Sequence, residues 1–378
     1  MATLIKSLSF KWDIWTRKYI FFVAETKQEI DACIHILEEV RRKELNRVVG
    51  ESVLDSSAFA GKKTDFTLVA CKDKKTGEVI SCMKITNAKE LKDVPASCAE
   101  YHLDQFDEEL IPKLDIYTRL AVLPDYRKTP AGFITMHNSF RLTLKNGGMG
   151  VLMSCEPSLL SMYNGFGLRP IGPMYNSSSG GYRIPMILFP DLDYFKKTNS
   201  PALSFAKQID FADYQPIQDW YKKLVEDSGG IETGATFYNY KLDKKHIHHL
   251  LTDGMTKKGM DAFLKNTLLI ECSEDDMLMA ANDGGKAFGI VRKGRVKILI
   301  DENATVYLNP GDIFGEMAYV LGTKRTADVV ADEEGTEVIL FSVSAIKRLE
   351  NESDKIVIWQ NLAKILARKL ALTNELIH

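Results

Sequence analysis

The chain has 378 residues, 45% of them hydrophobic and 26% charged, which is enough for two globular domains that each bury a core. Its 49 lysines and arginines against 51 aspartates and glutamates leave a net charge of -2, so bulk electrostatics provides no field for holding nucleic acid. No apolar stretch is long enough to predict a membrane-spanning helix, and the six scattered cysteines form no CxxC pair. We therefore expect a cytoplasmic protein with free thiols.

The first half of the chain alternates between strand-like and helix-like runs. Apolar residues at helical spacing predict helices over residues 27–45, 131–145 and 157–163. Short β-rich runs predict strands over residues 20–24, 66–71, 79–85, 116–123 and 151–155, with further strands up to residue 188. This alternation indicates an α/β or α+β domain with a mixed sheet over residues 1–195. The turn-rich segment 196–245, which includes a predicted helix over 217–225, is expected to be a helical connector.

The last third changes to short β runs separated by turns. A helix is expected over residues 246–264, and six strands are expected between Thr267 and Val343. Short strands at this spacing predict a small β-barrel or jelly roll over residues 246–378, so the whole chain is expected to be α+β. Helices over 344–351 and 354–376 follow the strands. The last of them carries an apolar stripe, formed by Ile358, Leu362, Ile365, Leu366, Leu370 and Leu376.

The segment 314–327 carries the strongest chemical pattern of the chain. Gly315 has no Cβ, so the backbone there can approach a ligand closely. A one-turn helix expected over 317–321 offers N–H groups and a partial positive charge to one phosphate, and Arg325 adds a two-pronged charged contact. Glu316, an acceptor when ionised, suits a vicinal sugar hydroxyl. A cyclic mononucleotide combines such a sugar with a singly charged phosphate.

This stretch resembles the phosphate-binding cassette of the cyclic-nucleotide-binding domain family, whose pattern is F-G-E-x-A followed by R-[TAS]-A. The resemblance covers nearly all of residues 246–378 and includes the glycine turns upstream of the cassette. It implies that Glu316 holds the ribose hydroxyl, that Arg325 holds the cyclic phosphate and that the last helix closes over the base. The residues that it assigns to the nucleotide are Phe314, Gly315, Glu316, Met317, Ala318, Arg325, Thr326 and Ala327.

Several properties of this domain stay open at the level of sequence. Members of the family that lose their ligand usually lack the arginine or the glutamate, and both are present here, so we expect binding rather than a degenerate pocket. Thr326 leaves cAMP and cGMP as alternatives, because a hydroxyl there accompanies guanine recognition but is tolerated beside cAMP. No helix-turn-helix pattern follows the last helix, which argues against a transcription factor. The apolar stripe of that helix is expected to cover the base, to form a homodimer seam, or both, and the ordinary role of such a stripe is packing against the barrel.

A second pattern lies in the first half of the chain, where residues 115–132 run from a strand through a basic loop into a helix. The helix N-terminus, together with Arg127 and Lys128, forms a plausible cradle for a pyrophosphate. Further along, a strand, a short helix with Tyr163 and a turn at Gly167 follow one another.

Residues 10–195 resemble the GNAT N-acyltransferase superfamily, and within it the N-acyl amino acid synthase and acyl-homoserine-lactone synthase branch. Arg119-Leu-Ala-Val-x-Pro-x-x-Arg127 resembles the acyl-CoA pyrophosphate loop, and Tyr163 to Leu168 resembles the Y-x-x-x-G-F signature. The resemblance implies an acyl-CoA or acyl-carrier thioester as donor, an amine as acceptor, and Tyr163 as the acid that protonates the leaving thiolate. The residues that it assigns to the donor are Leu120, Ala121, Val122, Arg127, Lys128, Thr129, Ala131 and Gly132.

The N-terminal region also departs from that pattern. Pro130 stands in place of the first loop glycine, and Ile116 in place of the glutamate of the lactone-synthase branch. Asp115 lies on the strand face of Arg119, so it is either a substitute base or a surface carboxylate. Tyr163 is either the acid or a core aromatic residue. No metal site is expected, because the histidines at 246–249 lack i, i+4 spacing.

The sequence therefore indicates two alternative functions. The first is an N-acyltransferase regulated by cAMP or cGMP, with a free amino acid or a protein lysine as acceptor. The second is a non-catalytic nucleotide sensor whose GNAT-like domain serves as an interaction module.

Overall fold

The computed structural model describes residues 17–45, 66–127, 129–172, 174–177, 181–227, 251–264, 267–282, 287–301, 304–347 and 349–377. The chain divides into two compact units. The first consists of residues 1–155, 162–172 and 185–230, and the second of residues 156–161, 173–184 and 231–378. No helix among the described residues combines the length and the apolar character needed to cross a membrane.

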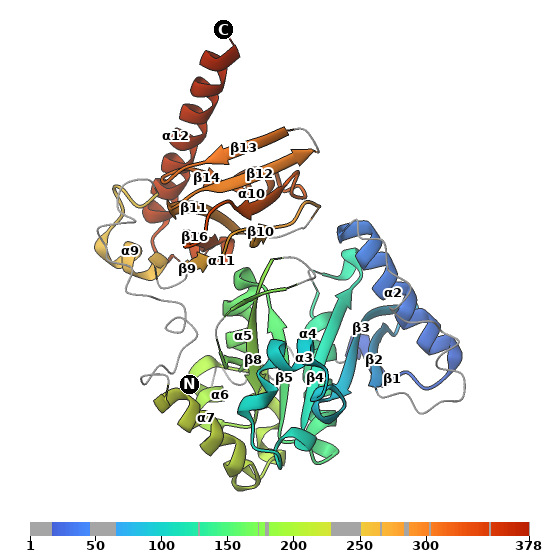
Figure 1. Cartoon of the computed structure of the whole chain (residues 1–378). Coiled ribbons are helices and arrows are strands. Elements are labelled where there is room, and N and C mark those ends of the chain that lie inside the picture. Colours follow the sequence, from blue (N-terminus) through green and yellow to red (C-terminus); the bar gives the residue numbers. More distant parts are fainter. Residues whose placement is uncertain are drawn as a thin grey trace. The chain divides into compact units, whose positions relative to one another are not determined.

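The first unit is built around a mixed sheet with the strand order β1-β2-β3-β4-β5-β8-β6 (Figure 1). Strands β1 to β4 pair in antiparallel fashion, and β4 pairs with β5 in parallel. The strands are β1 (Tyr19–Val23), β2 (Phe66–Asp73), β3 (Val79–Asn87), β4 (Leu114–Val122), β5 (Gly150–Cys155), β6 (Arg169–Pro170), β7 (Tyr175–Asn176) and β8 (Tyr182–Leu188). The predicted mixed sheet is confirmed.

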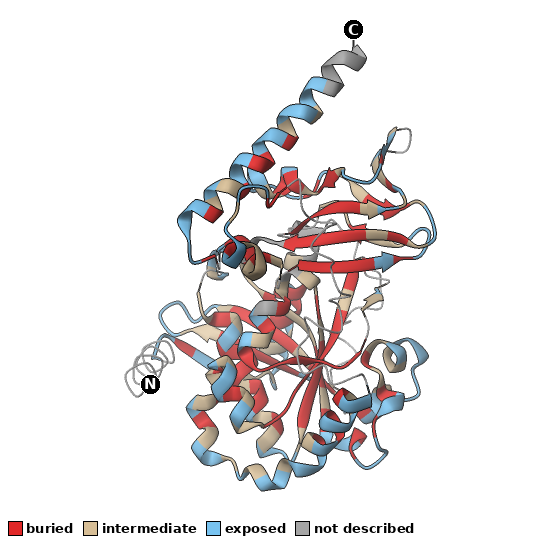
Figure 2. Ribbon diagram, turned by 90° about the vertical axis from the view of Figure 1, so that its left-hand side faces the viewer, coloured by how far each residue is buried: buried red, intermediate tan, exposed pale blue. Residues whose placement is uncertain are grey.

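Helices cover both faces of this sheet. Alternate residues of a strand point to opposite faces, and on β2 Ala70 packs with α2 (Lys27–Leu45) whereas Cys71 packs with α4 (Ala131–Lys145). The two long helices therefore lie on opposite sides, and Figure 2 shows the buried residues concentrated on the strands between them. The shorter elements of this unit are α3 (Pro95–Tyr101), most of α5 (Leu160–Phe166), α6 (Leu192–Thr198) and 3-10 turns that include η7 (Pro201–Gln208).

Helix α7 (Gln215–Asp227) differs from the expectation of a connector, because it packs into the core of the first unit. Its buried residues Ile217, Trp220 and Tyr221 share one cluster with Ile116 and Phe189 of the sheet. Their spacing of three and four residues places them on one helix face. The predicted connector, residues 196–245, therefore includes a helix that belongs to the core of the first unit. The residues between 228 and 250 lie outside the described part of the chain.

The second unit contains two four-stranded antiparallel sheets, with the orders β10-β15-β12-β13 and β14-β11-β16-β9. Their strands are β9 (Thr267–Cys272), β10 (Met277–Met279), β11 (Ala287–Lys293), β12 (Val296–Asp301), β13 (Ala304–Leu308), β14 (Ile313–Phe314), β15 (Asp328–Ala331) and β16 (Thr336–Ser342). The helices are α9 (Lys257–Leu264), α10 (Glu316–Leu321), α11 (Val343–Lys347) and α12 (Glu352–Ile377). The predicted β-rich domain with flanking helices is confirmed.

Helix α12 packs on the second sheet through Ile358, Leu362 and Ile365, which share a core cluster with Phe288 and Phe341. Helix α9 is shorter than the range 246–264 expected from sequence. It begins at Lys257, because the hydroxyl of Thr256 accepts a hydrogen bond from the Gly259 N–H at 3.0 Å and thereby caps the first turn. Residues 251–256 form turns, and 246–250 lie outside the described chain.

Candidate functional site

The nucleotide cassette is a sharp turn between β14 and α10. Gly315 has φ +74° and forms the N-cap of α10, so the helix begins one residue earlier than expected. A Cβ on Gly315 would lie 2.5 Å from the Sδ atom of Met279 and 2.6 Å from Nη1 of Arg325. Both the left-handed backbone and the close approach therefore require glycine here.

Arg325 is buried beneath this turn, with 6% of its surface exposed. Its Nη2 atom donates to the carbonyl oxygen of Ala287 at 2.7 Å, and Nη1 donates to the carbonyl oxygen of Gly315 at 3.3 Å. The guanidinium is thus fixed between the start of β11 and the cassette. A fixed guanidinium presents a preoriented positive charge to a phosphate.

Glu316 is the first residue of α10 and is also buried, with 4% of its surface exposed. Its Oε1 atom accepts a hydrogen bond from Nζ of Lys369 on α12 at 3.1 Å. The same Nζ donates to the carbonyl oxygen of Ile313 at 2.6 Å. The cassette carboxylate is therefore held by the last helix of the domain.

The structure brings together only part of the eight residues assigned to the nucleotide. Gly315, Glu316 and Arg325 meet at the turn, whereas Phe314 is a core residue whose ring packs over Gly289. Ala318 is buried, Ala327 is half-buried, and Met317 and Thr326 are exposed. Lys369 was missed, because no local pattern on a helix indicates which loop its side chain will reach.

The candidate donor site lies where β4 and β5 separate. Their register covers three residue pairs, from Leu114–Gly150 to Ile116–Leu152, and β4 then continues to Val122. Arg119 has φ +57°, and the pairing with β3 shifts between Thr118 and Ala121, which is the geometry of a β-bulge. The bulge turns the strand end that contains Leu120, Ala121 and Val122.

The loop after β4 is ordered by its own hydrogen bonds. Nε of Arg127 donates to the carbonyl oxygen of Val122 at 3.2 Å, and the hydroxyl of Thr129 donates to the carbonyl oxygen of Tyr126 at 2.6 Å. Helix α4 then begins at Ala131, and its N-cap residue Pro130 makes no side-chain cap hydrogen bond. Lys128 lies outside the described residues.

Tyr163 lies on α5, a helix that contacts the start of α4. It is buried on α5, where Phe166, one turn later, stacks on Phe133 in the first turn of α4 with ring centroids 6.1 Å apart. Residues three apart share a helix face, so Tyr163 and Phe166 point to the same side. Helix α5, which carries Tyr163, therefore packs beside the first turn of α4.

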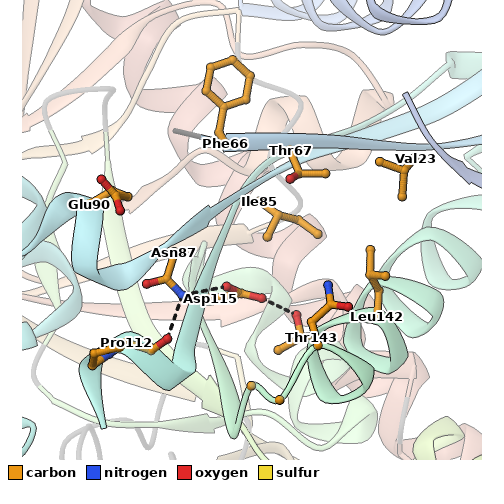
Figure 3. A pocket seen from close by; sticks show the side chains of 13 residues that line it. Val23, Phe66, Thr67, Ile85, Asn87, Glu90, Pro112, Asp115, Leu142 and Thr143 are labelled. Carbon is orange, nitrogen blue, oxygen red and sulfur yellow. Dashed lines mark hydrogen bonds between the residues drawn. The ribbon is translucent and has the colours of Figure 1, made fainter. Parts of the chain in front are cut away.

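Asp115 lies at the other end of α4. Its carboxylate accepts hydrogen bonds from the hydroxyl of Thr143 at 2.6 Å and from Nδ2 of Asn87 at 3.3 Å (Figure 3). The hydroxyl of Tyr117 donates to Thr143 at 2.8 Å, and burial raises the pKa of Tyr117 well above its usual value. Thr143 is twelve residues from Ala131, about 18 Å along a helix, so the structure does not bring Asp115 to the donor loop.

The Asp115 side chain lines a cavity of about 620 Å³. Figure 3 shows side chains of the cavity wall. Its wall is formed by Val23, Phe66, Thr67, Ile85, Asn87, Glu90, Pro112, Asp115, Leu142, Thr143, Asn146, Gly147 and Gly148. The hydrogen bonds to Asp115 join β3, β4 and α4, which is a sufficient structural role for this residue. Within the described residues, no group of three or more histidine, cysteine or acidic side chains could hold a metal ion.

Comparison with known proteins identifies a known domain within the second unit. Residues 269–353 match the family model of the cyclic nucleotide-binding domain. A solved cyclic nucleotide-binding domain from Methylobacillus flagellatus is similar, at 19% identity over 32% of this chain and 72% of that chain, with a TM-score of 0.30. No curated protein matches the chain.

The first unit is similar to solved acyltransferases. FeeM, an N-acyl amino acid synthase from uncultured soil microbes, matches at 13% identity over 51% of this chain and 100% of that chain, with a TM-score of 0.36. The ribosomal-protein-S18-alanine N-acetyltransferase from Escherichia coli matches at 13% identity over 45% of this chain and 93% of that chain, with a TM-score of 0.30. The family-model match confirms the resemblance of the C-terminal region to the cyclic nucleotide-binding domain over residues 269–353, and the resemblance of the first unit to N-acyltransferases stays a prediction.

Proposed function

We propose that this protein is an N-acyltransferase regulated by a cyclic nucleotide. The second unit binds cAMP or cGMP, and the first unit moves an acyl group from an acyl-CoA or acyl-carrier thioester to an amine. The observation that carries the proposal is the burial of the Arg325 guanidinium and the Glu316 carboxylate on either side of Gly315. A buried positive and a buried negative group at one glycine turn suit a ligand that offers both a phosphate and a hydroxyl.

The nucleotide takes up hydrogen bonds that the domain otherwise makes within itself. The phosphodiester oxygens accept from Arg325, whose nitrogens already point toward the Gly315 and Ala287 carbonyl oxygens. The sugar hydroxyl donates to Glu316. Because both side chains are buried, these charged hydrogen bonds act in a region of low effective dielectric and are stronger than at the surface.

Acyl transfer is proposed for the opening between β4 and β5. The backbone of Leu120 to Val122 pairs with the pantetheine arm, and the loop with Arg127, Lys128, Thr129, Ala131 and Gly132 holds the pyrophosphate. The amine nitrogen attacks the thioester carbonyl, so that a C–N bond forms and the C–S bond breaks. Tyr163 donates its proton to the departing thiolate, and the amine proton passes to a base.

Either a free amino acid or a protein lysine supplies the amine in this proposal. Asp115, the base predicted from the sequence, does not fit this step, because its carboxylate is separated from the donor loop by most of the length of α4, and no residue is assigned as the base. A homodimer through α12 and a reducing, cytoplasmic location complete the proposal, and the latter agrees with six free cysteines.

One feature favours the second candidate, a nucleotide sensor without catalysis. Pro130 replaces a loop glycine and has no N–H, so the cradle before α4 loses one donor to the pyrophosphate. Titration calorimetry with acyl-CoA of several chain lengths, with and without cAMP or cGMP, separates the two candidates. Heat of binding at one length supports the enzyme, and no heat at any length in either state eliminates it and leaves the sensor.

A further inference from the structure

The cavity that Asp115 lines belongs to the first unit and is separate from the candidate donor site. It borders the last turn of α4 through Leu142 and Thr143, whereas the donor loop precedes the first turn of that helix. Among the described residues assigned to the acyl donor, none lines this cavity. Its volume of about 620 Å³ lies in the range of small-molecule sites. A ligand held there is therefore distinct from the thioester.

The described wall of the cavity contains negative charge and no positive charge. Asp115 and Glu90 supply two carboxylates, and no lysine, arginine or histidine is among the described lining residues. Two lysines of neighbouring elements lie outside this wall. The Nζ atom of Lys84 is over the Phe66 ring, 4.4 Å from its centroid, and Lys145 is exposed in the last turn of α4. A lining of this kind favours a cationic ligand.

Asp115 is oriented in advance to hold such a cation. It is half-buried, and its described hydrogen-bond donors are both uncharged: Nδ2 of Asn87 donates to Oδ1 at 3.3 Å, and the hydroxyl of Thr143 donates to Oδ2 at 2.6 Å (Figure 3). Asn87 also donates to the Pro112 carbonyl oxygen at 3.0 Å, and Thr143 also bonds the Tyr117 hydroxyl at 2.8 Å. The carboxylate is thus fixed by neutral groups that leave its charge uncompensated. Each of its oxygens keeps a second lone pair for an N–H of a ligand.

The end of helix α4 favours a cation as well. Its last turn contributes Leu142 and Thr143 to the wall, and the turn Asn146–Gly148 follows directly. Aligned peptide dipoles give the C-terminus of a helix a partial negative charge, which stabilises a cation near the last turn. The helix end and the two carboxylates therefore act on a ligand in the same direction.

Another part of the wall is apolar. Ile85 is buried, Val23 and Leu142 are half-buried, and in the view of Figure 3 Val23 and Leu142 lie on the side of Asp115 opposite to Glu90. A hydrocarbon chain packed there would remove apolar surface from water. A bare metal ion fits less well, because no group of three histidine, cysteine or acidic side chains among the described residues could hold one. The wall therefore suits a ligand that joins an ammonium group to a short hydrocarbon chain.

We propose that this cavity binds a small aliphatic primary amine. The ammonium group donates to Asp115 beside the end of α4, and the hydrocarbon chain packs on the apolar part of the wall. Glu90, which is exposed, adds a second negative charge to the cavity. The bound amine is not the acceptor of acyl transfer, because most of the length of α4 separates Asp115 from the donor loop. The site is therefore independent of the proposed function and is tested without nucleotide or thioester.

Ligand-observed NMR with the full chain tests the charge of the ligand. Butylamine is the probe, and butanol and butyrate are its neutral and anionic counterparts of similar size. We expect butylamine to bind at least about tenfold more tightly than either counterpart, because neither of them forms a charged hydrogen bond with a carboxylate. Equal binding of butanol or butyrate, or no binding of butylamine, overturns the proposal.

Asp115→Asn locates the site, because it removes the charge and nearly keeps the shape of the side chain. Butylamine affinity should fall by more than about tenfold. The matched control is Asp104→Asn, since Asp104 is an exposed aspartate of the same unit that does not line the cavity. Its affinity should equal that of the wild type. A folded Asp115→Asn that binds butylamine as tightly as the wild type does refutes this site.

Thr67→Lys is a second variant that does not disturb Asp115. Thr67 is an exposed residue of the wall, so a lysine there places an ammonium group in the cavity and should weaken butylamine binding by at least about tenfold. Thr76→Lys adds the same charge at an exposed position between β2 and β3, outside the cavity, and should bind as the wild type does. If thermal unfolding shows that Asp115→Asn does not fold, this pair of variants decides. Equal affinities of the two lysine variants contradict the proposal.

Discussion

Arg325 and Gly315 define one site from two positions ten residues apart. Nη1 of Arg325 donates to the carbonyl oxygen of Gly315 at 3.3 Å, and a Cβ on Gly315 would lie 2.6 Å from that same nitrogen. The turn and the guanidinium are therefore mutually dependent. A larger residue at 315 would displace the Arg325 guanidinium. A shorter side chain at 325 would leave the carbonyl oxygen of Gly315 without this hydrogen-bond donor.

Gly315→Ala is expected to weaken nucleotide binding by a steric route. Gly322, the C-cap of α10, is the matched control, because its φ of +66° imposes the same backbone penalty but a Cβ there meets nothing within 4 Å. We expect Gly322→Ala to lower the free energy of unfolding by about 1 kcal/mol and to keep nucleotide affinity. Gly315→Ala should lose more than about tenfold in affinity and more stability, measured by titration and thermal unfolding. Equal losses in both variants would mean that the close approach to Arg325 is unimportant.

Arg325→Ala removes the buried charge and both backbone contacts. We expect nucleotide affinity to fall by more than about tenfold, because a charged hydrogen bond to the phosphate is lost. Arg295→Ala is the control, since Arg295 pairs with Asp332 at 2.6 Å on the surface of the same unit. Calorimetric titration of both variants with cAMP and cGMP provides the measurement. Unchanged affinity in Arg325→Ala would place the phosphate elsewhere.

Tyr163→Phe tests the catalytic half of the proposal. Loss of the proton donor should lower kcat by about a hundredfold and leave donor affinity unchanged, because a general acid acts only in the transition state. Tyr117→Phe makes the same chemical change at a hydroxyl bonded to Thr143, away from the donor loop. That variant should keep its kcat. A steady-state assay of thiol release measures kcat for both variants. A normal kcat for Tyr163→Phe would mean that Tyr163 is a core aromatic residue and not the acid.

His137 makes the first unit sensitive to acid. It is buried, and burial together with Arg141 lowers its pKa from 6.5 to about 3, while its Nε2 atom bonds the hydroxyl of Ser204 at 2.8 Å. The unfolded chain takes up a proton near pH 6.5 that the folded chain does not, so stability falls as the pH drops below 6.5 toward 3. The slope approaches about 1.4 kcal/mol per pH unit.

Thermal unfolding between pH 7 and pH 4 measures this effect. His137→Gln should flatten the dependence, since glutamine does not titrate, whereas His35→Gln should retain it because the His35 side chain is 75% exposed. A profile of His137→Gln parallel to that of the wild type would assign the acid sensitivity to carboxylates.

Local structure followed closely from the order of residues. The predicted helices over 27–45 and 131–145 agree with α2 and α4 residue for residue, because their apolar spacing and flanking turn residues act within a few positions. The order Phe-Gly-Glu likewise brings the cassette glycine and carboxylate together without help from distant parts of the chain. Short elements such as α3 and β10 were missed, since so few residues carry too little periodic signal.

What only the tertiary structure decided is which distant groups meet. Helix α7 looked like part of a connector, yet Trp220 is buried against Phe106 because a long-range hydrophobic surface was available to it. Asp115 and Arg127 are close in sequence but lie toward opposite ends of α4. Lys369 reaches Glu316 across 53 positions. Side-chain contacts of this kind depend on how helices pack on sheets, and packing is set by the complementary shape of surfaces that no local pattern encodes.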